Sequence, residues 1–135
     1  MRHFLLVYFL LLNTAWLSGC VPAITTAASL GGSAAMNHTS NGITYRTFTA
    51  KSTKVRAATL NALNRMQIKV ISDNLQEKTN IWLLSAKTDD RNIEIQIEPI
   101  SVNTTRVRVT AKSSIFSYDS ATAEEIIQQT KRALG

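Results

Sequence analysis

Apolar and polar residues alternate strictly over residues 92–98, the most regular pattern in the chain, and predict a strand over residues 92–100. Three isoleucines occupy one face of this segment, whereas Glu94, Gln96 and Glu98 occupy the other. A similar alternation over residues 105–112 sets valines against arginines. Both patterns predict strands with one buried face. Shorter patterns predict three more strands, at residues 43–48, 68–74 and 81–87.

Turn lengths predict how the last three strands pair. A two-residue turn at 89–90 brings apolar residues together, with Ala86 opposite Ile93, Leu84 opposite Ile95 and Trp82 opposite Ile97. A three-residue loop at 101–103, with Asn103 in the left-handed conformation that asparagine tolerates, sets Glu98 against Arg106 and Gln96 against Arg108. A shift of one residue would place apolar residues opposite charged ones in both hairpins. The sequence therefore predicts an antiparallel meander.

Two segments have the period of amphipathic helices. The first runs over residues 54–66 with Thr53 as its cap, and the second over residues 121–134 with Asp119 or Ser120 as its cap. The predicted buried faces are Val55, Ala58, Thr59, Ala62, Leu63 and Met66 in the first, and Ala123, Ile126, Ile127, Thr130, Ala133 and Leu134 in the second. The order strand, helix, four strands, helix predicts an α+β two-layer sandwich. An antiparallel sheet of about five strands would carry both helices on one face.

The first residues have the three parts of a secretory signal. A basic start at Arg2 precedes nine apolar residues at 4–12, and small residues precede Cys20. As a helix, the apolar run would span about 14 Å, well short of the roughly 30 Å of a bilayer core. The pattern therefore favours a cleaved signal over a permanent membrane span.

The segment Leu17-Ser18-Gly19-Cys20 resembles the bacterial lipobox. The resemblance implies diacylglycerol on the Cys20 sulfur, cleavage after Gly19 and acylation of the new amino terminus. Because Cys20 is the only cysteine, an internal disulfide is excluded. Val21 follows it instead of aspartate, which by resemblance to known sorting rules favours the outer membrane of a Gram-negative cell, facing the periplasm.

Three parts of the chain follow from these signals. Residues 1–19 form a cleaved lipoprotein signal peptide, residues 20–41 form the lipidated cysteine and a flexible tether, and residues 42–135 form a single α+β domain. Residues 21–41 carry no charge and are rich in Ala, Thr, Ser and Gly. A flexible tether of this length reaches roughly 25 Å.

The chain is basic. Losing Arg2 with the signal leaves fourteen Lys and Arg against nine Asp and Glu, a net charge of +5. Export argues against nucleic acid as a partner and favours anionic envelope surfaces such as phospholipid or lipopolysaccharide phosphates. A solvated basic surface without a specific partner explains the same composition.

The residues that catalysis requires are scarce. His38 is the only histidine after the signal and lies in the predicted tether, so a catalytic or metal cluster would depend on a flexible segment. Asp89 and Asp90 fit turn chemistry better than a cation site. Trp82 faces the predicted core, which favours packing over ligand binding. We therefore expect a non-enzymatic domain with no catalytic residue, metal or cofactor.

The polar face of the sheet is the candidate docking surface. Its candidate residues are Glu94, Glu98, Arg106, Arg108, Ile81 and Leu83. Cross-strand pairing explains the charged residues without any function. A mixed polar and apolar exposed face is also what a protein partner could dock on.

Three features together resemble a known family. They are the lipobox, the segment Ala57-Ala58-Thr59-Leu60, and the segment from Glu98-Pro99 through Asn103-Thr104-Thr105-Arg106-Val107. They resemble small bacterial lipoproteins known as domain of unknown function 3568, over about residues 17–134. This chain has fewer glycines after the cysteine than that pattern, and the resemblance supplies no catalytic residues.

Two functions are compatible with these features. The first is a membrane-anchored envelope module that docks a protein partner, and the second is a small-ligand or lipid-binding domain with a cavity between sheet and helices. The sequence leaves the oligomeric state open.

Overall fold

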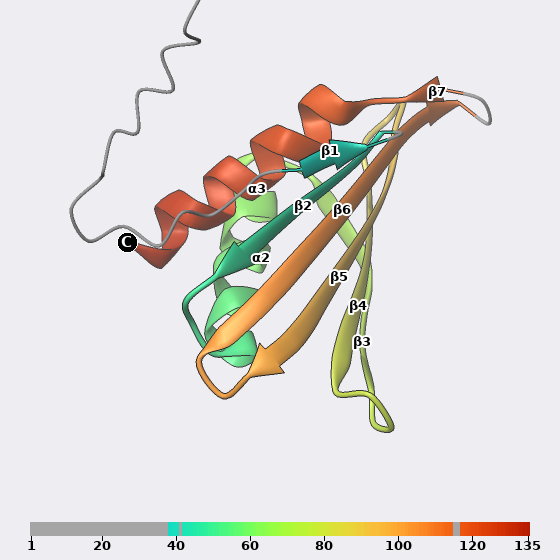
Figure 1. The fold of residues 1–135 in the computed structure, drawn as a ribbon. Coiled ribbons are helices and arrows are strands. Elements are labelled where there is room, and N and C mark those ends of the chain that lie inside the picture. The colour runs from blue at the N-terminus through green and yellow to red at the C-terminus, as the bar shows by residue number, and fades with distance from the viewer. Residues whose placement is uncertain (1–37, 41, 115–116) are drawn as a thin grey trace, which may run out of the picture. The chain divides into compact units, whose positions relative to one another are not determined.

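The computed structural model describes residues 38–40, 42–114 and 117–135, which form a sheet and a helical layer (Figure 1). Within these ranges the elements, in chain order, are β1 (His38–Ser40), β2 (Ile43–Phe48), α2 (Ser52–Arg65), β3 (Lys69–Gln76), β4 (Ile81–Lys87), β5 (Asn92–Ser101), β6 (Thr104–Ser114), β7 (Ser117–Tyr118) and α3 (Ser120–Leu134). Neither described helix is long and apolar enough to cross a membrane.

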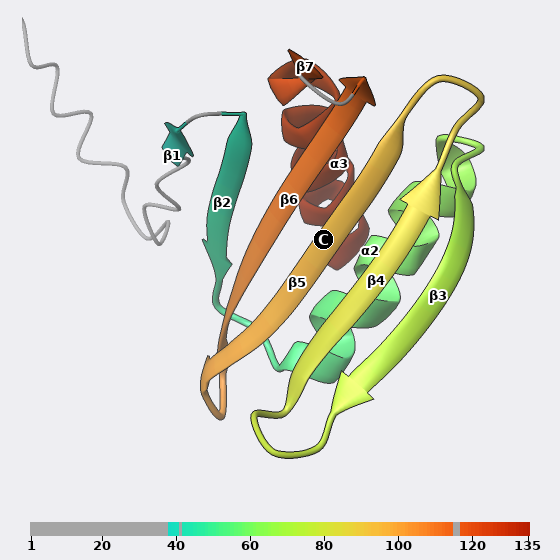
Figure 2. The ribbon, with the colours of Figure 1, turned by 90° about the vertical axis from the view of Figure 1, so that its right-hand side faces the viewer.

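The sheet is antiparallel throughout, and both helices lie on one of its faces. The strand order is β1-β2-β6-β5-β4-β3, with β7 paired to β6. The chain leaves β2 through α2, starts again at the opposite edge with β3, and returns strand by strand until β6 pairs with β2. In Figure 2 both helices lie behind the sheet. The predicted α+β class with two helices on one face is confirmed.

The predicted register of the meander is also confirmed. Trp82, Leu84 and Ala86 pair with Ile97, Ile95 and Ile93, and Arg106 and Arg108 pair with Glu98 and Gln96. At the β4–β5 turn, the Thr88 N–H donates to the Arg91 carbonyl over 3.0 Å. Pairing the apolar residues of neighbouring strands therefore predicted the observed register.

The predicted conformation of the β5–β6 loop is wrong. Ser101 pairs with Thr104, and the register shifts between Pro99 and Ser101, so Ile100 forms a bulge. Asn103 does not adopt the left-handed conformation. Because Ile100 is the extra residue in β5, a two-residue turn can close the hairpin while the pairs from Pro99 back to Asn92 stay as predicted.

The predicted Thr53 cap is wrong as well, although the buried face of the helix is right. α2 begins at Ser52, and its N-cap Lys51 makes no side-chain capping bond. Lys51 is extended and its carbonyl accepts the Val55 N–H at 3.0 Å, so Thr53 already lies inside the first turn. The buried residues of α2 are Val55, Ala58, Thr59, Ala62 and Leu63, whereas Met66, which was also predicted to be buried, is the C-cap and is only partly buried.

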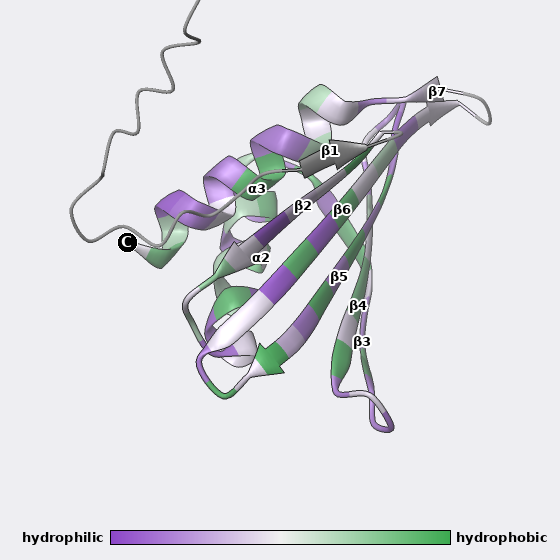
Figure 3. Ribbon diagram, viewed as in Figure 1, coloured by the Kyte–Doolittle hydropathy of each residue, from purple (hydrophilic) through white to green (hydrophobic). Residues whose placement is uncertain are grey.

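The space between the layers is filled by branched aliphatic side chains. Ile97, Val107 and Val109 from the sheet and Leu63 and Ile126 from the helices are all 0% exposed. Figure 3 shows the alternation of apolar and polar residues along β5 and β6 that produces this arrangement. Trp82 packs against the edge of this core, as predicted.

One ion pair ties α2 to the far edge of the sheet. Arg56 donates from Nε to Oδ1 of Asp73 over 3.1 Å, and its Nη2 contacts the other carboxylate oxygen. Its guanidinium also lies over Trp82, with 4.3 Å from the guanidinium carbon to the ring centroid. Hydrogen bonding to Asp73 raises the pKa of Arg56.

The sequence patterns missed two short strands. β1 lies inside the range 20–41 that the sequence assigns to the tether, and β7 extends the end of β6. Gly42, at φ +76°, packs against the Tyr118 side chain so closely that a methyl group on Gly42 would overlap it. These strands were missed because segments of two or three residues are too short to show a period.

Asp119 caps α3, one of the two predicted alternatives. It accepts the Thr122 N–H over 3.0 Å and the Thr122 hydroxyl over 2.7 Å, and it forms an ion pair with Arg91. The Thr122 N–H, the Thr122 hydroxyl and Arg91, in that order, lower the pKa of Asp119 from 3.8 to about 2. The cap thus also fixes the start of α3 to the β4–β5 turn.

Replacing Asp119 by alanine should lower the free energy of unfolding by about 1 to 2 kcal/mol, because both cap and ion pair are lost. Asp119→Asn should lose less, since asparagine also caps helices. The folded pKa of Asp119 lies below the ordinary value, so its contribution is present above about pH 4 and disappears as the pH falls toward 2. Urea titrations of all three proteins would show wild type losing its advantage over Asp119→Asn across that range. A constant difference would contradict this.

Candidate functional site

The sheet face opposite the helices brings the six predicted docking residues together. We call it the outer face; it comprises the outward residues Ile43, Tyr45 and Thr47 of β2, Arg106, Arg108 and Thr110 of β6, Glu94, Gln96 and Glu98 of β5, Ile81, Leu83 and Ser85 of β4, and Ser72, Asn74 and Gln76 of β3. Alternation along each strand places them there, because their neighbours in sequence face the helices.

One cross-strand row runs through the middle of the outer face. Tyr45 pairs with Arg108, Arg108 with Gln96, Gln96 with Leu83, and Leu83 with Asn74. An aromatic ring, a cation, two amides and an aliphatic side chain thus lie side by side. Such a row can offer hydrogen bonds, charge and apolar contact to a single partner.

Two charged residues of the outer face neutralise each other. Arg106 donates to the same carboxylate oxygen of Glu98 from Nη2 at 2.6 Å and from Nε at 3.0 Å. The two side chains are 48% and 37% exposed. A surface pair of this kind contributes at most about 1 kcal/mol to stability. Cross-strand pairing therefore explains Arg106 and Glu98 without any role in binding a partner.

Arg108 is not neutralised in this way. Its guanidinium carbon lies 5.7 Å from the centroid of the Tyr45 ring. Its Nε is inaccessible to solvent and has no hydrogen-bond partner. Among the described residues, the ion pairs include neither Arg108 nor Glu94. Within the described residues, Arg108 is therefore a cation beside an aromatic ring that has no carboxylate partner.

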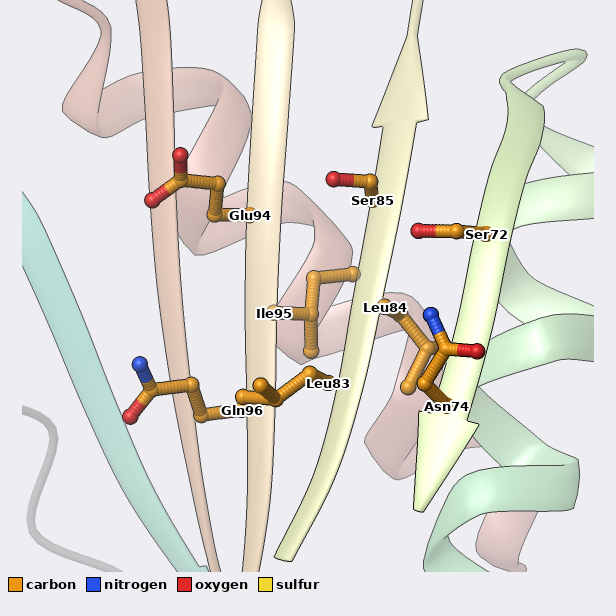
Figure 4. A pocket seen from close by; sticks show the side chains of 8 residues that line it. All are labelled: Ser72, Asn74, Leu83, Leu84, Ser85, Glu94, Ile95 and Gln96. Atoms are coloured by element: carbon orange, nitrogen blue, oxygen red, sulfur yellow. The ribbon is translucent and has the colours of Figure 1, made fainter. Parts of the chain in front are cut away.

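Two adjoining depressions shape the outer face. One, of about 350 Å³, is lined by Tyr45, Gln96, Glu98, Arg106 and Arg108. The other, of about 310 Å³, is lined by Ser72, Asn74, Leu83, Leu84, Ser85, Glu94, Ile95 and Gln96 (Figure 4). Gln96 lines both, so the two depressions adjoin at this residue, and we call the pair the groove. In Figure 4 the side chains of Glu94 and Gln96 extend from β5 toward β6.

The structure does not describe the predicted lipidation site, and its described residues contain no metal-binding cluster. Cys20 and the lipobox residues Leu17, Ser18 and Gly19 lie outside the ranges that the structure describes. Within those ranges, no three His, Cys, Asp or Glu residues are grouped so as to hold a metal ion. Asp90 accepts the Thr88 hydroxyl at 3.0 Å and pairs with Arg91, in keeping with a role in the turn.

Sequence patterns missed Tyr45 as a neighbour of Arg108. Its outward position follows from the alternation in residues 43–48. Its neighbour does not, because β2 pairs with a strand more than fifty residues later in the chain. No hairpin turn joins β2 to β6, so turn length could not be used to predict their register.

Comparison with known proteins identifies a family for this chain but no activity. A search of curated proteins found no match to this chain. A family model described as "Protein of unknown function (DUF3568)" matches residues 3–132, which is nearly the whole chain and includes every strand of the outer face. The chain belongs to this family.

Proposed function

We propose that this protein is a lipid-anchored envelope protein whose non-enzymatic domain docks a protein partner through the outer face. The lipobox ending at Cys20 supports the anchor, and Val21 supports an outer-membrane location facing the periplasm.

The arrangement around Arg108 carries the docking proposal. Its guanidinium sits on Tyr45 in an open groove, with Leu83 contributing apolar surface one strand beyond Gln96. Arginine and tyrosine, together with tryptophan, are enriched among the residues that dominate binding energy at protein interfaces. A partner that presents a carboxylate beside an apolar side chain would match this groove.

A ligand cavity between the sheet and the helices is the less favoured alternative. The side chains that meet there, among them Ile97, Val109 and Ile126, are 0% exposed. The two depressions of the central sheet lie on the outer face instead. Packing of this kind favours docking on the surface over binding in the interior.

The docking proposal is tested by reversing one charge on the outer face. The full-length chain would be cross-linked and purified from its native membrane as wild type and as Arg108→Glu, and the proteins that copurify would be quantified. We expect recovery of the partner to fall at least about tenfold, because the variant repels the carboxylate that Arg108 binds.

Lys78→Glu is the matched control, since Lys78 is exposed in the β3–β4 turn and undergoes the same charge reversal. Its profile should equal that of wild type. If Arg108→Glu and Lys78→Glu recover the same proteins in equal amounts, the outer face is not the docking surface.

A further inference from the structure

Charge is distributed very unevenly along the domain. All nine acidic residues lie at or after Asp73, whereas residues 42–72 contain six Lys and Arg and no acid. This basic stretch comprises β2, α2 and the start of β3. Asymmetry of this kind indicates an interaction with an anionic surface, provided that the fold gathers the charges in one place.

The fold brings two of these residues, Lys51 and Lys54 at the start of α2, to the end of α3, which carries Lys131 and Arg132. We call this region the basic corner and define it as Lys51, Lys54, Lys131 and Arg132. All four are exposed, and none takes part in an ion pair within the described residues. Lys54 and Lys131, which are 77 positions apart in the chain, line one depression of about 290 Å³. Its other lining residues are Phe48, Thr49, Ala50, Leu134 and Gly135, so no Asp or Glu side chain lines it.

A buried cation adds to the positive charge beside this depression. Arg46 is 6% exposed, and within the described residues its side chain makes one hydrogen bond, from Nη1 to Gln128 Oε1 at 3.4 Å. Its Nε has no partner, and its guanidinium carbon lies 5.6 Å from the ring centroid of Phe48, which lines the depression. A buried charge without a carboxylate is screened weakly, so its field reaches the nearby surface.

We propose that the basic corner is the surface through which the domain contacts anionic phospholipid headgroups. Lysines at the rim can bind phosphates while their aliphatic stems pack on Phe48 and Leu134, which line the same depression. This proposal rests on the anchoring part of the proposed function, because lipid on Cys20 would hold the domain within reach of the membrane. The corner belongs to the helical layer, so the outer face on the other side of the sheet stays free for a partner.

Vesicle cosedimentation tests the corner without the lipid anchor. The probe is the chain from residue 20 onward with Cys20→Ser, which retains every described residue and the whole core, with circular dichroism to confirm that each variant is folded. Vesicles of phosphatidylcholine alone are compared with vesicles that also contain phosphatidylglycerol. The triple variant Lys51→Gln, Lys54→Gln and Lys131→Gln should bind the anionic vesicles at least about tenfold more weakly than the parent chain.

The matched control removes three exposed lysines elsewhere. They are Lys69, Lys78 and Lys87, each replaced by glutamine, and the loss should be about threefold or less because only the net charge changes. Equal losses in both triple variants would overturn the proposal, and so would a parent chain that does not prefer phosphatidylglycerol. Binding of inorganic phosphate by the parent chain without retention on phosphatidylglycerol vesicles would identify a site for free phosphate and also overturn it. None of these outcomes bears on acylation of Cys20 or on docking at Arg108.

Discussion

Replacing Ile95 by alanine is expected to lower the free energy of unfolding by about 2 to 5 kcal/mol, the usual cost of emptying a filled core position. Ile95 lies in the middle of β5, is 1% exposed, and belongs to the core between the sheet and the helices. Replacing the next residue, Gln96, by alanine should change the free energy of unfolding by no more than about 0.5 kcal/mol. The two residues share a strand and differ in the face that they occupy.

Urea denaturation followed by circular dichroism measures both differences. The comparison is sharp because the two sites have the same backbone conformation and neighbouring positions in the same ladder. Comparable losses in the two variants would contradict the exposed position of Gln96, since truncating an exposed side chain costs far less than emptying a core position. That result would argue against the whole groove around Arg108 as an exposed site.

Local patterns predicted the meander because its pairings are local. Residues that pair across the β4–β5 and β5–β6 hairpins are separated by short turns, so matching the apolar faces determines the register. The corrections at Thr53 and Asn103 concern single backbone conformations. Different capping and turn geometries can satisfy the same apolar pattern, so that pattern does not select among them.

Long-range neighbours were not predictable in this way. Alternation showed that Arg108 points outward, but its contact with Tyr45 depends on the pairing of β2 with β6. Lys54 and Lys131 likewise meet only because α2 and α3 pack side by side on the sheet. Sequence patterns can therefore assign a residue to a face, whereas clustering on that face or at its edge depends on the topology.

Replacing Cys20 by serine should abolish incorporation of radiolabelled palmitate. A serine hydroxyl cannot form the thioether that the lipobox resemblance implies, and no other cysteine exists in the chain to replace it. The expected loss is complete, which makes this the largest effect among the predictions. The measurement is autoradiography of the immunoprecipitated protein, together with its distribution between membrane and soluble fractions.

Moving the cysteine tests whether acylation requires the lipobox sequence or only a thiol near the signal. In the double variant Cys20→Ser and Ser29→Cys, the new thiol follows Thr26-Ala27-Ala28, which lacks the aliphatic residue of Leu17-Ser18-Gly19. We expect no label in this variant, and full label in the single control Ser29→Ala. Label that persists in Cys20→Ser would refute the anchor. Label that returns only with Ser29→Cys would show that any thiol near the signal suffices, and that the lipobox does not specify the site. The same Cys20→Ser chain provides the unanchored domain on which contact at the basic corner is measured, so anchoring and surface contact are tested independently.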